Sequence, residues 1–395
     1  MLKSRLCIAF FAFAVGCAPA QKPLTDYVNP MLGTATLWDS VDLGFKPTKR
    51  TWGAEVFPGS SLPNAMVQVS PVTKFHSGAG YQYEDSVIYG FTHTNKGHWN
   101  LCHIPLLPVT GTPTPGDYCS PFSHERESAA PGYYQVFLDR YGVDAQLSST
   151  LRCAFHKYTY PAGAAASLLA DLQRSNEHVR AWDIRKEGDN VFAGWQQTGE
   201  KMYFYAVANR PVTGIEPVVE GDREVRIVRF GEGDGALELR IGFSFVSEEN
   251  ARKNLEAEML GRSFADVRSE ATAVWNDLLG RIRVEGGTER EKGLFYSCLY
   301  RSFLWPALRS DVNGEFTDAD GEVVNTGFRY YTGPSYWDDY RNKLILLGLL
   351  APDVAADVIS SDTDRGEKRG GFMPTFFHGD HASAFVAGVY LRGIR

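Results

Sequence analysis

The sequence lacks the short motifs that mark several large enzyme classes. It contains no P-loop, no G-x-G-x-x-G fingerprint, no G-x-S-x-G nucleophile elbow and no H-E-x-x-H zinc motif. These motifs position phosphates, dinucleotides, a nucleophilic serine or a zinc-bound water. Their absence removes the commonest NTPase, dinucleotide-dependent, α/β-hydrolase and zinc-protease interpretations.

Basic residues are also few. The chain has 395 residues with 40 Lys and Arg against 47 Asp and Glu, a net charge of −7. Binding to nucleic-acid phosphates needs clustered positive charge, so we expect no nucleic-acid partner. The 44% of apolar and 13% of aromatic residues exclude a disordered chain. The longest apolar run lies within the first 20 residues and is too short for a mature membrane anchor.

Cysteine is scarce, with six residues and no C-x-x-C pair, so zinc-ribbon and thioredoxin-like motifs are absent. Cys102 and Cys119 have two interpretations, a disulfide formed in an oxidising compartment and two separate buried thiols.

Residues 1–20 have the order of an export signal, with charged Lys3 and Arg5 followed by an apolar segment. Two cleavage sites compete. Ala18-Pro19-Ala20 would leave Gln21 at the N-terminus, whereas Ala14-Val15-Gly16-Cys17 resembles a lipobox and would leave a lipid anchor on Cys17. A buried N-terminal helix is the structural alternative. Export predicts a location in the periplasm or on the bacterial cell surface.

Alternating apolar and polar residues predict that residues 21–246 form a large β-sandwich. The 39 glycines and 20 prolines suit such a turn-rich fold. Clear alternation occurs in Ala65–Val69, Tyr134–Leu138, Glu224–Val228 and Leu237–Ile241.

Helical spacing replaces this pattern after residue 246. Residues 247–284 form a predicted helical linker with periodicity over 247–282, and residues 285–395 form a second helical region. Further helices are predicted over residues 289–308, 340–350, 352–361 and 380–392.

Several loops combine residues that bind sugars. The loop Gly90–Trp99 contains His93, His98 and Trp99, which suit sugar hydroxyls and an apolar ring face. A solvated loop with one buried aromatic residue is the alternative without a binding function. A metal site using His93 and His98 is a further alternative with a weak sequence signal.

Two further segments place carboxylates before apolar helices. In Tyr336–Arg341, Asp338 and Asp339 are either helix caps or, beside Trp337, part of a sugar subsite. Asp380, between two histidines, caps a helix or holds a sugar hydroxyl or a water. The segment Asp318–Glu322 resembles the start of a calcium loop, but the remaining ligands do not follow, so we predict a turn.

Many blocks, in one order, resemble glycoside hydrolase family 92, the calcium-dependent exo-acting α-mannosidases. They begin at Tyr27-Val28-Asn29-Pro30 and cover residues 25–395. The main ones are Val56–Pro63, Met66–Pro71, Gly80–Tyr83, Ile88–Thr94, Pro131–Tyr134, Trp337-Asp338 and Gly379–Ala382.

This resemblance implies a β-sandwich N-terminal domain, a helical linker and an incomplete (α/α)6 barrel. It implies hydrolysis of terminal α-mannosyl linkages in N-glycans or mannan with inversion, by a Glu acid and an Asp base spaced about 6.5–9.5 Å apart. Ca²⁺ would hold the sugar hydroxyls. Asp338 matches the family's Trp-Asp carboxylate in the sugar pocket, Trp337, Asp380 and His381 match the barrel mouth, and His93 matches a sandwich loop over the site.

The family's acid, base and main calcium ligands follow the block that matches Gly379-Asp380-His381. We therefore expect the catalytic residues downstream of Arg395 and assign no catalytic or metal-binding residue. These 395 residues alone are then expected to be inactive.

Two loops depart from the family pattern, Lys96–His103 and the Ser77-Gly78 region, where a Trp is usual, so the linkage specificity stays open. Three rivals also stay open: a non-catalytic carbohydrate-binding protein, a phosphorylase with the same two-domain plan, and a structural surface lipoprotein.

Overall fold

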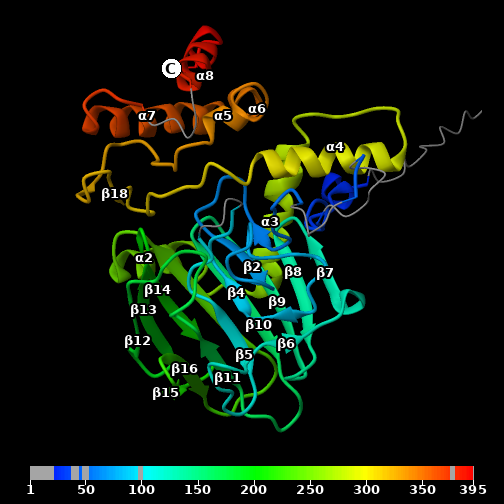
Figure 1. The fold of residues 1–395 in the computed structure, drawn as a ribbon, viewed down its shortest axis with the longest axis vertical. Helices are drawn as coiled ribbons and strands as arrows, with labels where there is room; N and C mark the ends of the chain where they lie inside the picture. The colour runs from blue at the N-terminus through cyan, green and yellow to red at the C-terminus, as the bar shows by residue number, and fades with distance from the viewer. Residues whose placement is uncertain (1–21, 37–43, 47–52, 97–100, 374–378, 395) are drawn as a thin grey trace, which may run out of the picture.

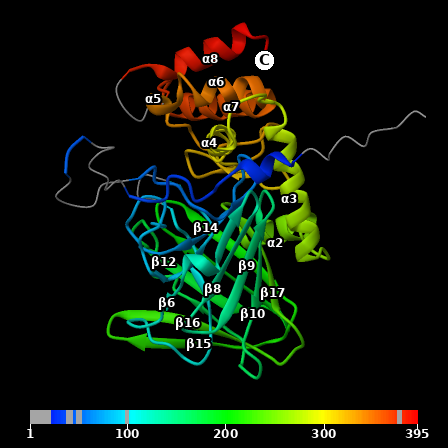
Figure 2. The same ribbon diagram turned by 90° about the vertical axis from the view of Figure 1, so that its right-hand side faces the viewer.

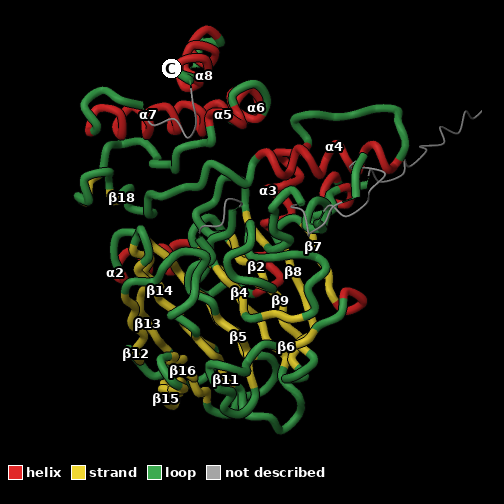
Figure 3. The backbone as a smooth tube through the Cα atoms, viewed as in Figure 1, coloured by secondary structure: helices red, strands yellow, loops and turns green. Residues whose placement is uncertain are grey.

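The computed structural model describes residues 22–36, 44–46, 53–96, 101–373 and 379–394. Strands dominate the first part of the chain and helices the last part (Figure 3). The strands stack into a two-sheet sandwich, and helices α5 to α8 lie beyond one end of it (Figures 1 and 2). None of the helices within these ranges has the length and apolar character needed to cross a membrane. The expected export segment lies outside the described residues.

The first sheet has seven antiparallel strands in the order β1-β2-β4-β5-β11-β16-β15. Their bounds are β1 (Ser60–Ser61), β2 (Gln68–Val72), β4 (Gly90–Thr92), β5 (Leu106–Val109), β11 (Ser167–Ala170), β16 (Arg223–Phe230) and β15 (Val212–Glu220). A separate small pair joins β3 (Val87–Ile88) to β6 (Ser120–Pro121).

The second sheet has eight antiparallel strands in the order β12-β13-β14-β17-β10-β9-β8-β7. Their bounds are β12 (Ala181–Lys186), β13 (Val191–Gln197), β14 (Lys201–Ala208), β17 (Leu237–Ser244), β10 (Cys153–Thr159), β9 (Val143–Ser149), β8 (Tyr133–Leu138) and β7 (Glu127–Ala130). A short 3-10 helix, η2 (His124–Arg126), precedes β7.

Burial along the strands explains why this sequence forms a sandwich. In β14, burial alternates residue by residue, and Met202, Phe204 and Ala206 are fully buried. One apolar face per strand then packs against the opposite sheet. The strands predicted within residues 134–138, 224–228 and 237–241 are confirmed as β8, β16 and β17.

The strand predicted over residues 65–69 is wrong at its start, because β2 begins only at Gln68. Met66 and Val67 are fully buried, and their backbone amides both donate to the carbonyl of Leu151, at 2.9 and 3.2 Å. The segment therefore crosses the end of the sandwich as a buried loop, although its residues alternate.

A capped break divides the first predicted helical stretch, residues 247–282, into two helices. Helix α2 (Glu248–Glu258) starts at the N-cap Ser247, and α3 (Phe264–Leu279) starts at Ser263 with a capping box. Gly261 between them has a φ of 78°, a left-handed conformation that glycine adopts without strain. Both helices pack on the second sheet, and each therefore has one apolar face. As a result, the spacing of apolar residues stays helical on both sides of the break.

The later helices are confirmed in type with different ends. They are α4 (Glu289–Ser302), α6 (Lys343–Leu350), α7 (Pro352–Lys368) and α8 (His381–Leu391). The short helix α5 (Tyr336–Asp339) was not predicted. Helix α4 ends before residue 308 because Pro306 cannot donate a backbone hydrogen bond and restricts the residue before it. The chain is thus mostly sheet first and helical afterwards, whereas closure of the helices into a barrel stays a prediction.

A buried carboxylate fixes the exit from the sandwich into the helices. Asp311 accepts hydrogen bonds from the Ser244 hydroxyl at 2.6 Å and from the side-chain amides of Asn250 and Asn254 at 2.9 and 2.6 Å. These residues come from the end of β17 and from α2. Burial raises the pKa of Asp311, and the three donors oppose that shift.

The N-terminal segment is tied to helices that lie far along the chain. The 3-10 helix η1 (Leu24–Tyr27) packs on both α3 and α4. The amide of Thr25 donates to Asn276 Oδ1 at 3.1 Å, and the amide of Asn29 donates to Ser297 Oγ at 2.9 Å.

The four cysteines of the described residues are free thiols, so the Cys102–Cys119 disulfide does not form in this structure. Cys102 is fully buried beside Gly80, and burial raises the pKa of its thiol to about 12. The alternative of separate thiols holds.

Candidate functional site

Charged side chains from both regions meet where the sandwich faces the helices. Lys96, in the loop between β4 and β5, has its Nζ atom 4.1 Å from the ring centroid of Trp305, which follows α4. The pKa of Lys96 is lowered to about 8, mainly because burial disfavours the charged amine. Lys343 acts in the same direction, whereas Asp339 and Asp338 act against it. A sandwich lysine thus lies within electrostatic reach of both carboxylates predicted from the sequence.

The two carboxylates extend from the short helix α5. The Ser335 hydroxyl donates to Asp338 Oδ2 at 2.6 Å, and Lys343 Nζ lies 2.7 Å from Asp339 Oδ2. Neither aspartate is a helix N-cap, because Ser335 has that position in α5 and Asn342 has it in α6. Asp338 is exposed and Trp337 is 50% exposed, so both are accessible to a ligand.

A cavity of about 850 Å³ lies beside this cluster, between the β13–β14 turn and the segment that follows α4. Its lining includes Glu200 and Lys201 from the sandwich and Arg309, Tyr330 and Arg365 from the helical region. This volume is within the ~300–1,000 Å³ that is typical of small-molecule sites. The lining combines rings with charged groups, which suits a polyhydroxylated ligand.

Arg309 connects the cavity to the carboxylate cluster. Its guanidinium lies 4.1 Å from the Phe245 ring centroid and 3.3 Å from Glu200 Oε2, and it lowers the pKa of Lys96. Trp305, beside it, donates from Nε1 to the carbonyl of Gly333 at 3.2 Å. Lys96, Arg309, Asp338 and Asp339 therefore form one mixed-charge surface, which we call the interdomain cluster.

The structure places His93 in the sandwich core, away from this surface. His93 is fully buried, its Nδ1 lies 2.9 Å from the carbonyl of Ile104, and its Nε2 lies 3.0 Å from His156 Nε2. Burial lowers the pKa of His93 to about 3, so the ring is neutral. With both ring nitrogens bonded inside the protein, this setting corresponds to a structural role. The alternative metal site also needs His98, which lies outside the described residues.

The start of α8, Asp380 and His381, lies beside the residue that follows α5. The ring of His381 stacks on Tyr340, which directly follows α5, with centroids 4.3 Å apart. Asp380 is the N-cap of α8 and accepts from the amide and hydroxyl of Ser383, at 3.2 and 2.5 Å, which lowers its pKa. The fold thus brings Trp337, Asp338 and His381 into one neighbourhood and excludes His93 from it.

Sequence reasoning missed two members of the interdomain cluster, Lys96 and Arg309, and it also missed Trp305 beside them. Lys96 was visible in the unusual loop that also holds His93, but nothing local showed that it faces the helices. Trp305 and Arg309 lie at the predicted end of α4, where helical periodicity conceals a loop.

Acidic groups do not form a metal site within the described ranges. No three His, Cys, Asp or Glu side chains there come together as metal ligands. The segment Asp318–Glu322 is the turn between β18 (Phe316–Thr317) and β19 (Val323–Val324), with Gly321 at a φ of 86°. The Asp318 carboxylate accepts the amides of Asp320 and Glu322, both at 2.9 Å, which confirms the predicted turn.

Two family models match the chain. Residues 27–252 match the glycosyl hydrolase family 92 N-terminal domain, and residues 250–395 match the glycosyl hydrolase family 92 catalytic domain.

Known proteins show the same likeness. A family GH92 α-mannosidase structure from Bacteroides thetaiotaomicron is 25% identical with a TM-score of 0.86, and the match covers 95% of this chain and 55% of that one. An inverting GH92 mannosidase from the same organism is 25% identical with a TM-score of 0.79, covering 95% and 54%. An uncharacterized secreted glycosidase of Arthroderma benhamiae is 25% identical over 344 residues, 73% of this chain and 42% of that protein. The chain thus spans about half the length of these relatives.

Proposed function

Because the chain belongs to glycosyl hydrolase family 92, we propose that the protein is an exo-acting α-mannosidase that releases terminal α-mannosyl residues from glycans with inversion. The observation that carries the proposal is the match of both family domains along residues 27–395. The interdomain cluster and its cavity supply the sugar-sized polar site that the activity requires. A structure of a related α-mannosidase holds mannoimidazole, which supports mannose as the ligand class.

We assign roles to the sequence-predicted residues on this basis. Asp338 accepts a hydrogen bond from a hydroxyl of the mannose to be released, and Trp337 shapes that pocket. A hydrogen bond to a charged group is worth about 1.5–3 kcal/mol, which makes Asp338 the strongest single contact in the set. Asp380 and His381 line the same mouth through their position beside Tyr340. His93 supports the sandwich behind the loop that carries Lys96.

Lys96 and Arg309 extend the proposed subsite from the sandwich side. Both are nitrogen donors, so they suit sugar oxygens, whereas Asp338 suits sugar hydroxyl hydrogens. Because the pKa of Lys96 is about 8, the amine is mostly charged at neutral pH and loses charge in mild alkali. The general acid and base are assigned to no residue of this chain.

Calcium dependence is the second part of the proposal, and it follows from the family. Among the described residues, no three His, Cys, Asp or Glu side chains come together as candidate metal ligands. Asp338 and Asp339 are balanced by Lys96 and Lys343. No step is therefore derived through the metal, and removal of calcium with EDTA tests its requirement directly.

Export is the third part. We propose that residues 1–20 direct the protein out of the cytoplasm, with cleavage either after Ala20 or before a lipid-modified Cys17. The secreted glycosidase of Arthroderma benhamiae supports export in this family. Mass spectrometry of the mature N-terminus separates the two cleavages, because only one leaves an acylated Cys17.

The test uses the complete reading frame, because the matched relatives are about twice as long as this chain. We expect hydrolysis of an aryl α-mannoside, with the β-anomer of mannose as the first product seen by proton NMR. In the Asp338→Ala variant we expect kcat/KM to fall about 30-fold or more, equivalent to about 2 kcal/mol. The matched control is Asp353→Ala, an exposed carboxylate in the first turn of α7.

Two results would count against the proposal. Unchanged kcat/KM in the Asp338→Ala variant would remove that residue from the subsite. Binding of mannosides without any release of mannose would favour the carbohydrate-binding rival, and turnover that depends on phosphate would favour the phosphorylase.

A further inference from the structure

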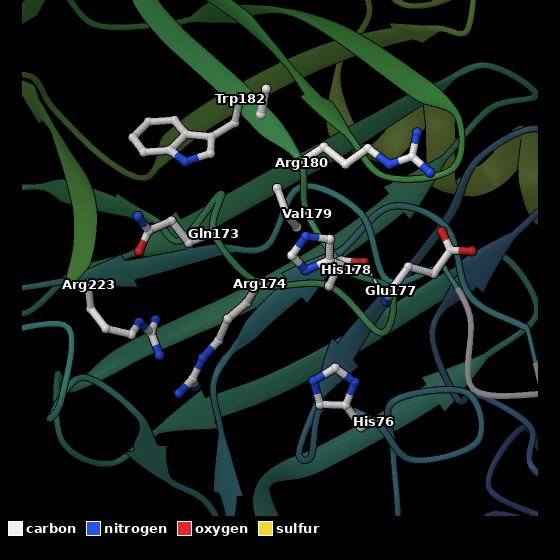
Figure 4. A pocket seen from close by; sticks show the side chains of 11 residues that line it. His76, Gln173, Arg174, Glu177, His178, Val179, Arg180, Trp182 and Arg223 are labelled. Carbon is white, nitrogen blue, oxygen red and sulfur yellow. Dashed lines mark hydrogen bonds between the residues drawn. The ribbon is translucent and has the colours of Figure 1, made fainter.

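A second cavity lies in the sandwich, apart from the residues that line the interdomain cavity. Its volume is about 600 Å³. It is formed by the connection between β11 and β12, the start of β12, Arg223 at the start of β16, and His76. Figure 4 shows Trp182, Gln173 and Arg223 along one side, Glu177 along the other, and His178 between them. We call it the sandwich pocket.

Positive charge prevails in the sandwich pocket. Three arginines line it, Arg174, Arg180 and Arg223, against one glutamate. Beneath it, the fully buried Asp171 lies 2.6 Å from the Arg223 guanidinium and 3.7 Å from that of Arg174. One carboxylate thus balances two guanidiniums, and the exposed Arg180 adds a third cation.

The glutamate of the pocket is engaged elsewhere. Glu177 Oε2 accepts from the Thr198 hydroxyl at 2.8 Å and lies 3.6 Å from His103 Nε2. Hydrogen bonding from His103 and Thr198 lowers the pKa of Glu177, so it stays ionised and committed to these partners. The arginines therefore present an excess of positive charge toward a ligand.

His76 is held in an unusual backbone conformation at the pocket. Its φ is 58°, in the left-handed region that side chains other than glycine rarely adopt. The His76 amide donates to Asn176 Oδ1 at 2.8 Å, and Nδ1 donates to the Asn176 carbonyl at 3.1 Å. This bond fixes the tautomer and leaves Nε2 as an acceptor. Strain of this kind is retained where the surroundings impose it, commonly at functional sites.

An aromatic wall completes the pocket. Trp182 is partly buried, and the Arg226 guanidinium lies 5.3 Å from its ring centroid. Indole rings cover the apolar face of a sugar, whereas paired guanidiniums bind phosphate or carboxylate through bidentate hydrogen bonds. The volume of about 600 Å³ suits one or two sugar rings rather than a polymer such as nucleic acid.

We infer that the sandwich pocket binds a sugar that carries an anionic group, a phosphate or a carboxylate. Arg223 holds the anion, Trp182 on the same side of the pocket faces the sugar ring, and His76 Nε2 accepts a hydroxyl. Arg180, on the other side of the pocket, adds positive charge (Figure 4). The inference rests on the proposed function only in taking the ligand to be a sugar. If this inference holds, the substrates are anionic glycans. The charged sugar unit of the glycan binds in the sandwich pocket while another sugar unit is cleaved.

Direct binding tests this without requiring hydrolysis. Isothermal titration of the purified protein should show binding of mannose 6-phosphate or glucuronate at least about tenfold tighter than of mannose, because charge-assisted bonds are stronger. The tighter of these two ligands, mannose 6-phosphate or glucuronate, shows whether the pocket prefers a phosphate or a carboxylate. Binding of inorganic phosphate as tight as that of mannose 6-phosphate would overturn the sugar contact, and equal binding of mannose would overturn the anion contact.

Substitutions locate the site. Arg223→Gln removes the guanidinium on the Trp182 side, and we expect it to weaken binding of the anionic sugar about tenfold. Arg180→Gln changes an exposed side chain on the other side of the pocket and should weaken binding less. The matched control, Arg290→Gln on the exposed face of α4, should change nothing. Asp338→Ala should lower kcat/KM for mannosides about 30-fold without changing this binding, so failure of the proposed function and failure of this inference are distinguishable. An unchanged affinity in both Arg180→Gln and Arg223→Gln would overturn the assignment.

Discussion

Polar side chains in the sandwich core and around the start of α8 and α5 are held in opposite ways. In the sandwich, His103 is fully buried, and its ring nitrogens lie 2.7 Å from the Thr94 hydroxyl and 2.9 Å from the Thr198 hydroxyl. In the helical region, Asp338 and Asp380 are exposed, and each bonds a serine three residues away. Position is therefore set by tertiary structure for His103 and by a single turn of chain for Asp338 and Asp380. The same substitution should then unfold one region and only alter the surface of the other.

The largest effect is expected from Asp171→Ala in the sandwich. Asp171 accepts the Tyr118 hydroxyl at 2.6 Å and binds two arginines, so its loss leaves two partly buried guanidiniums without their counter-charge and the buried Tyr118 hydroxyl without its acceptor. We expect the free energy of unfolding to fall by about 3–5 kcal/mol in urea titrations. Asp353→Ala should leave it unchanged, and a loss below about 1 kcal/mol for Asp171→Ala would break the comparison.

Asp338→Ala should separate activity from stability. The residue is exposed and, within the described part of the chain, its carboxylate accepts a hydrogen bond only from Ser335. We therefore expect the free energy of unfolding to stay within about 0.5 kcal/mol of the parent. Transition-state stabilisation should nevertheless fall by about 2 kcal/mol. Urea titration and kcat/KM measured on one preparation give both values, and a parallel loss of stability would show that Asp338 is structural.

Lys96→Met should change the pH dependence of stability. Between pH 8 and 10 the folded protein loses the Lys96 proton that the unfolded chain still holds, so this residue makes stability rise with pH. The variant lacks that rise. The difference in free energy of unfolding between parent and variant should therefore change by roughly 1–2 kcal/mol between pH 8 and 10. Lys253→Met, on the exposed face of α2, provides the control and should follow the parent curve.

The smallest effect belongs to Asp380→Ala, which removes the N-cap of α8. The hydrogen bonds from Ser383 lower the pKa of Asp380, so its stabilising contribution exists at neutral pH and disappears as the pH falls through that pKa. Amide exchange in residues 381–391 should be faster in the variant at neutral pH and equal to the parent in acid. A difference that persists in acid would mean that the carboxylate is not the cause.

The sandwich was predictable because strands such as β14 and the first half of β9 repeat their burial pattern every second residue. The helices were predictable in type, but their ends depended on single residues such as Gly261 and Pro306. The buried loop over Ala65–Val67 was not predictable, because its alternation imitates a strand. Periodicity reports which residues are apolar and not where the chain turns.

The candidate site was predictable only on the helical side. Asp338 and Trp337 adjoin each other in the sequence, so their motif was visible. Lys96 and Arg309 are more than 200 positions apart, and only packing of the two regions brings them together. The sequence presented His93 as a sugar-binding loop residue, whereas the structure buries it, because the sequence does not show whether a loop residue points outward or into the core.

The tie between η1 and the helices has a consequence for synthesis. Asn29 cannot reach its partner until Ser297 has left the ribosome, so this early segment of the chain is among the last to find its place. Until then the sandwich strands assemble without this segment, and α3 and α4 lack one of their covers. A pause or truncation before residue 297 would leave the beginning of the protein loose and open to proteases, even though every strand of the sandwich had already been made.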